Sequence, residues 1–106
     1  MRALTFNFGT SGTLSWVFPV DVLIQYLRSS GASAILSMNP AVATADVGSG
    51  TNAVRTDIIA NAISGSGNGA TPVQNIGFPV SAGEKIYVAV SAATWAMVYY
   101  DERSTE

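Results

Sequence analysis

The stretch that decides the fold covers residues 78–100 and reads FPVSAGEKIYVAVSAATWAMVYY. Inside it, apolar residues alternate with small or polar ones in two runs, at 85–91 and at 94–100. Alternation at period two is typical of strands that bury one face. The residues expected to face the core are Ile86, Val88, Val90, Trp95, Met97 and Tyr99. We predict that the two runs pair with each other and close a β-sandwich.

The segment Gly83-Glu84-Lys85 precedes the first of these runs and contains the only Lys of the chain. It lacks the first Gly and the following Ser or Thr of a phosphate-binding P-loop. Glu84 and Lys85 are neighbours in a strand, so they point to opposite faces and are poorly placed to act on one substrate. The segment therefore predicts a turn. Gly83 supplies a positive φ as a hairpin hinge, and Glu84 and Lys85 stay in water.

Short β-type runs broken by Gly, Ser, Asn and Pro make up the rest of the chain. The runs at 3–8 and 13–18 are predicted to form a hairpin around the turn at 9–12, with one aromatic-rich face. Further strands are expected at 21–30, 33–39, 54–63 and 73–80. A helical alternative stays open for 21–30, where Leu23 and Leu27 are four residues apart, and for 54–63, which suits a strand or a turn of helix.

Three segments are not expected to form regular strands. Residues 40–53 are either a long loop or a weak edge strand, residues 64–71 a flexible loop, and residues 101–106 a polar tail. The chain thus has about seven or eight short strands with a turn roughly every 8–12 residues, which is typical of a sandwich or jelly roll. We predict one domain, residues 1–106, with an all-β, jelly-roll-like antiparallel β-sandwich fold.

Composition argues against most chemistry. The chain has no His and no Cys, so it lacks the commonest general base and any thiolate nucleophile or metal ligand. Its net charge is −2 with no basic cluster, which disfavours nucleic acid. No apolar segment approaches the roughly 18 residues that span a membrane. We therefore predict a protein that is not an enzyme, takes no cofactor and no metal, and binds neither nucleic acid nor membrane.

The low charge points instead to protein partners. Charged residues make up only 11% of the chain, against about 25% in ordinary soluble domains. Such a surface stays soluble more easily when partners cover part of it. Residues 1–12 lack the apolar run of a signal peptide, so synthesis in the cytoplasm is expected.

The carboxylates and Gly-rich loops give weak candidates for a site. The loop GSGNG at 65–69 has neither the spacing of a dinucleotide fingerprint nor a helix expected after it. No G-x-S-x-G elbow of a hydrolase occurs. The sequence leaves open whether Asp46 and Asp57 meet across a cleft, as the two acids of a glycosidase do. Asp21, just after Pro19-Val20, is expected to cap a turn.

The aromatic residues divide into two groups by their expected faces. Trp16 and Trp95 alternate in phase with other large apolar residues, which predicts core positions. Tyr87 and Tyr100 share their faces with Ala and Ser. They are the better candidates for exposed or subunit-contact aromatics, because Tyr is enriched at interfaces.

The segment NIGFPVSAGEKIYVAVSAATWAMVYYDE (75–102) resembles the closing strands of small bacteriophage virion proteins, and LRSSGASAILSMNP (27–40) has the same Ala/Ser/Gly character. Similar turns occur in other jelly rolls, including trimeric tumour-necrosis-factor-like heads. The family suggested is the jelly-roll capsid decoration, or cement, protein, or a related tail or fibre protein. The resemblance implies a β-sandwich, often a trimer, that sits on the capsid surface and locks neighbouring capsomers. No catalytic residue carries over.

The function expected from these features is structural. The partners would be the major capsid protein and further copies of the chain, probed first at five contact candidates: Met1, Arg2, Arg55, Tyr87 and Tyr100. The alternative is a tail or fibre module that binds a host receptor or glycan through aromatics and the Gly/Ser loops. A small hydrolase is the third reading and requires two carboxylates within one cleft.

Overall fold

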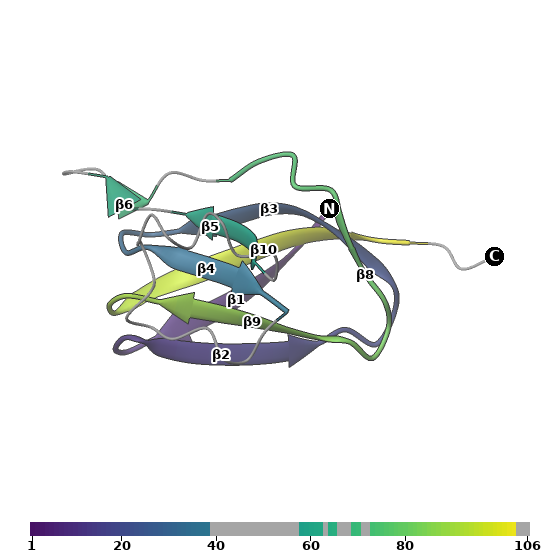
Figure 1. Ribbon diagram of the computed structural model, residues 1–106, viewed down its shortest axis with the longest axis horizontal. Helices are drawn as coiled ribbons and strands as arrows, with labels where there is room; N and C mark the ends of the chain where they lie inside the picture. The colour runs from purple at the N-terminus through teal and green to yellow at the C-terminus, as the bar shows by residue number, and fades with distance from the viewer. Residues whose placement is uncertain (39–57, 63, 66–68, 71–72, 104–106) are drawn as a thin grey trace.

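A computed structural model describes residues 1–38, 58–62, 64–65, 69–70 and 73–103. The described residues form strands, turns and bends and contain no helix, so the strand alternative holds for Val22–Ser29 and Ile58–Ala62. Two four-stranded antiparallel sheets lie one behind the other (Figure 1). Sheet A has the order β1 (Arg2–Phe8), β10 (Thr94–Glu102), β3 (Val22–Ser29), β8 (Phe78–Val80). Sheet B has the order β2 (Gly12–Val17), β9 (Lys85–Val90), β4 (Ala34–Ser37), β5 (Ile58–Ala62).

The pairing pattern is that of a rolled hairpin. β1 pairs with β10, β2 with β9, β3 with β8 and β4 with β5, all antiparallel. Each strand of the first half of the chain thus meets a strand of the second half, and the rolled ribbon divides into two facing sheets. This is the arrangement of an eight-stranded jelly roll. The predicted all-β, jelly-roll-like sandwich is confirmed. β6 (Ser64–Gly65) and β7 (Gly69–Ala70) pair with each other in a separate two-stranded sheet.

Two predicted hairpins are wrong. β1 and β2 lie in different sheets, and so do β9 and β10. The loops that join them cross from one sheet to the other, as the rolled topology demands of consecutive strands. The turn at Gly83 likewise joins β8 in sheet A to β9 in sheet B, so it is not a hairpin hinge. Its predicted positive φ is confirmed at 88°.

The core lies between the two sheets. The predicted inner face of β9 is confirmed, because Ile86, Val88 and Val90 are fully buried in the main hydrophobic cluster. The predicted inner face of β10 is wrong. Ala96 and Val98 are the fully buried residues of that strand, so the side chains that alternate with them point outward. Both faces of β10 are rich in apolar residues, so period two alone did not decide which face is buried.

A β-bulge in β3 explains why apolar residues occupy both odd and even positions of that strand. Tyr99 and Tyr100 of β10 pair with Tyr26 and Ile24 of β3, which leaves Gln25 as an extra residue. The extra residue shifts the alternation. Val22 and Ile24 are buried before the bulge, and Leu27 and Ser29 after it. The inner face of β3 therefore consists of even-numbered residues before the bulge and odd-numbered residues after it.

Candidate interaction surfaces

The outer side of sheet A carries a group of five residues that we call the aromatic face. Its members come from two paired strands, with Met97 opposite Arg28 and Tyr99 opposite Tyr26. The full set is Tyr26, Arg28, Trp95, Met97 and Tyr99. Arg28 is exposed and the other four are half-buried. Sequence reasoning missed this face because it assigned Trp95, Met97 and Tyr99 to the core.

Contacts within the aromatic face fix its side chains. The rings of Tyr26 and Tyr99 meet edge to face, with centroids 5.1 Å apart and planes at 84°. The guanidinium carbon of Arg28 lies 5.2 Å from the centre of the Trp95 ring, within the range of a cation–π contact. The hydroxyl of Tyr99 donates to the sulfur of Met97 at 3.5 Å. A hollow of about 200 Å³ opens between Met1, Tyr26, Arg28 and Tyr99.

The N-terminus is tied to the end of β10 beside this hollow. The amino group of Met1 lies 3.4 Å from a carboxylate oxygen of Asp101, and Arg2 lies 3.8 Å from Glu102. The other Asp101 oxygen accepts from the side-chain amide of Gln25 at 3.2 Å. Because the ion pairs are about half exposed, each contributes on the order of 0–1 kcal/mol. The expected polar tail thus begins later than predicted, because β10 includes Asp101 and Glu102.

A second surface, which we call the apolar edge, follows β2 and the bend after it. β2 is an outermost strand of sheet B, and all of its residues from Thr13 to Val17 are exposed. The large apolar residues of this edge are Leu14 (43% exposed), Trp16 (42%), Val17 (42%) and Val20 (39%). The predicted core position of Trp16 is therefore wrong. Its ring and that of the buried Phe18 meet edge to face, with centroids 6.5 Å apart.

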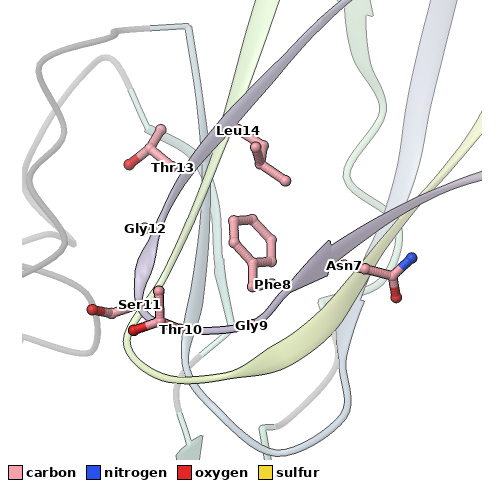
Figure 2. Close-up of a pocket in the computed structure, with 8 residues that line it drawn as sticks. All are labelled: Asn7, Phe8, Gly9, Thr10, Ser11, Gly12, Thr13 and Leu14. Carbon is pink, nitrogen blue, oxygen red and sulfur yellow. The ribbon is translucent and has the colours of Figure 1, made fainter.

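The loop between β1 and β2 encloses a second hollow next to the apolar edge. The hollow measures about 220 Å³ and is lined by residues 7–14. Figure 2 shows Phe8 and Leu14 pointing toward each other across it, while Thr10 and Ser11 point away from it. Phe8 packs against the core cluster. The hollow is therefore an opening of the core between the two sheets, at the end where β1 passes into β2.

Hydrogen bonds hold the turn at Gly83 and Glu84, which leads into Lys85 at the start of β9. The carboxylate of Asp21 accepts from the backbone N–H of Ala82 at 2.8 Å, which confirms the predicted capping role. Glu84 accepts from the backbone N–H of Ser81 at 2.9 Å. The N–H of Gly83 donates to the carbonyl of Phe18 at 3.0 Å. Glu84 and Lys85 are exposed as expected. These three hydrogen bonds hold the connection between β8 in sheet A and β9 in sheet B.

The remaining predicted contact residues are scattered. Tyr87 is half-buried on the outer side of sheet B, opposite Ser37. Tyr100 is half-buried and packs against the core cluster, with its ring on that of Phe18. Arg55, Asp46 and Asp57 lie outside the described residues, as do residues 66–68 of the GSGNG loop. Among the residues described, Met1 lines the hollow of the aromatic face, and Tyr87 pairs with Ser15 of the apolar edge.

The described part of the chain offers no centre for metal chemistry, since no group of three potential ligands among Asp, Glu, His and Cys gathers in it. No long apolar helix suited to crossing a bilayer occurs there either. Comparisons with protein-family models, curated proteins and solved structures give no match to this chain. The resemblance to phage decoration proteins accordingly stays a prediction, and the two surfaces carry the functional argument.

Proposed function

We propose that the chain is a virion structural protein of the capsid decoration type, which binds an assembled capsid lattice and stabilises it without catalysis. The aromatic face is the observation that carries this proposal. Trp, Tyr, Arg and Met are the residue types enriched in the centres of protein interfaces, and all five residues keep part of their surface in water despite their mutual contacts. The proposed partners are the major capsid protein and other copies of the chain, at the virion surface after synthesis in the host cytoplasm.

The aromatic face is suited to binding a rigid partner. The Tyr26–Tyr99 and Arg28–Trp95 contacts hold the side chains in place before any partner arrives. Residues that are already ordered lose less conformational entropy on binding. The strands beneath are the two central strands of sheet A, β10 and β3, so the backbone under the face is fixed on both sides.

The stabilising mechanism is mass action. A protein that binds only the assembled lattice stabilises it by RT ln(1 + [L]/Kd), about 2.7 kcal/mol per site at a hundredfold excess over Kd. Repeated over many sites, this raises the temperature and internal pressure at which a particle fails. No residue of the chain has to react for this to happen.

The test uses particles that carry the protein. We expect stripped particles to melt at a lower temperature and the purified chain to restore the original value. Trp95→Ala is expected to lose that restoration, whereas Thr10→Ala, in the exposed loop between β1 and β2, keeps it. Equal melting of stripped and decorated particles contradicts the decoration role. Full restoration by Trp95→Ala contradicts the aromatic face as the contact.

A receptor-binding tail or fibre module is the second candidate, and the hollow beside Tyr26 and Tyr99 favours it. Exposed aromatic rings stack on sugar rings, and Arg28 offers donors to an acidic sugar. A glycan-array signal that disappears in Tyr99→Ala while folding is retained supports this candidate over the first. Tyr100→Ala does not serve as the test, because Tyr100 faces the core.

A further inference from the structure

The apolar edge lacks the features that keep an edge strand from pairing. Natural edge strands are protected by charges, Pro, bulges or short length. In sheet A, Arg2 lies in the edge strand β1, and the edge strand β8 has three residues with Pro79 in the middle. β2 has six residues, GTLSWV, with no charge and no Pro. Its pairing with β9 is continuous, with no register shift between Gly12 and Val17.

The side chains of β2 also lack cover on both sides of the sheet. Leu14 and Trp16 pair with Val88 and Ile86, which face the core. They therefore stand on the inner side of sheet B, yet both remain more than two-fifths exposed. Thr13, Ser15 and Val17 alternate with them on the outer side and are exposed too. The inter-sheet layer is therefore open at this edge.

We propose that β2 pairs antiparallel with β2 of a second copy of the chain, about a two-fold axis at Ser15. In this register Leu14 of each copy lies opposite Trp16 of the other, and Thr13 lies opposite Val17. The pairing makes one eight-stranded sheet from two copies of sheet B and continues the inter-sheet layer across the axis. The closed two-fold leaves no further β2 edge, so the association stops at two copies.

This register is the self-pairing that uses every exposed residue of the strand. Antiparallel partners must lie on the same side of the sheet, so the axis has to pass through a residue rather than between two. An axis at Leu14 leaves Val17 unpaired, and an axis at Trp16 leaves Thr13 and Leu14 unpaired. With the axis at Ser15, Glu84 and Lys85 of one copy stand at the opposite end of the paired ribbon from Glu84 and Lys85 of the other, because Lys85 pairs with Val17 in each copy. No like charges face each other.

The interface is expected to be weak. Stable complexes bury about 800 Å² per partner, and a single short strand with Leu14, Trp16, Val17 and Val20 supplies less than that. The dimer should therefore form in a concentration-dependent way. On a lattice that holds two copies side by side, the same contact becomes effectively intramolecular and correspondingly stronger.

Sedimentation of the purified chain over a wide concentration range tests the pairing. We expect a reversible monomer–dimer equilibrium. Ser15→Lys is expected to be monomeric, because two like charges then meet at the axis, and Ser15→Glu likewise. Mixing these two variants should restore the dimer through the opposite charges. Thr5→Lys, on the exposed edge strand β1, is the matched control and should dimerise like the unmodified chain. Circular dichroism establishes that each variant is folded.

A cross-link tests the register. The chain has no Cys, so Ser15→Cys introduces a single thiol. Cα atoms of directly opposed residues lie about 4.5–5.5 Å apart, a distance that a disulfide spans. Mild oxidation should give a covalent dimer of Ser15→Cys and none of Thr5→Cys. A monomer at all concentrations, a trimer such as the family resemblance suggests, open-ended aggregation, or a dimer of Ser15→Lys equal to that of the unmodified chain each overturns the proposal.

Discussion

The ring of Tyr100 lies against the ring of Phe18, with centroids 4.8 Å apart and planes at 61°. Phe18 is 1% exposed, and Tyr100 packs on the same core cluster. Tyr100 continues the inner face of β10 that Ala96 and Val98 begin. The bulge at Gln25 brings Ile24 of β3 opposite it. An aromatic contact thus joins β10 of sheet A to Phe18, the residue that follows β2 of sheet B.

Tyr100→Ala is expected to destabilise the fold by about 2–3 kcal/mol, because it removes a large, partly buried ring from the core. Tyr99→Ala, one residue earlier on the outer side, is expected to cost about 1 kcal/mol or less. Urea unfolding of the two variants measures the difference. Equal losses for both would contradict the assignment of Tyr100 to the inner side and Tyr99 to the outer side.

Gly83→Ala is expected to lower the free energy of unfolding by about 1–2 kcal/mol. The φ of Gly83 is 88°, in the left-handed region that a Cβ disfavours. A Cβ there would meet no atom within 4 Å, so the loss is one of backbone strain alone. Gly31→Ala is the matched control, since its Cβ also meets nothing and its φ is not positive. A loss at Gly31 as large as at Gly83 would remove strain as the explanation.

Asp21→Ala is expected to destabilise the chain by about 1 kcal/mol, since the N–H of Ala82 loses the acceptor that lies 2.8 Å away. Asp21→Asn keeps a side-chain oxygen that can accept the same bond, so it should retain most of the stability. Thermal unfolding of both variants at neutral pH checks this. If Asn and Ala prove equally harmful, the carboxylate charge rather than the hydrogen bond holds the turn.

Local chemistry made some of these features predictable from the sequence. The inner face of β9 follows from Ile and Val alternating with residues of mixed polarity, and the positions of Asp21 and Gly83 follow from turn chemistry. These signals depend on neighbours along the chain. They predicted the strands, the turns and the sandwich class, because each strand in such a fold is short and has a turn nearby.

The sheet to which each strand belongs was not predictable in this way. Gly and Ser in the loops at 9–11 and 91–93 suit a connection within a sheet as well as one that crosses between sheets. The faces of β10 are both apolar, so its orientation depends on which neighbours cover it. Trp16 shows the same limit, since its exposure comes from the edge position of β2 and not from its own pattern. The aromatic face was missed for this reason.

Ala96→Leu tests the reversed face of β10. Ala96 is fully buried between the sheets, so three added carbons must displace core side chains, which costs about 1–3 kcal/mol. Met97→Leu changes a half-buried residue of the aromatic face and is expected to cost less than about 1 kcal/mol. Urea unfolding with a constant m-value for both variants makes the two numbers comparable. A neutral Ala96→Leu together with a harmful Met97→Leu would restore the orientation that the alternation alone predicts, and it would remove the aromatic face as a binding surface.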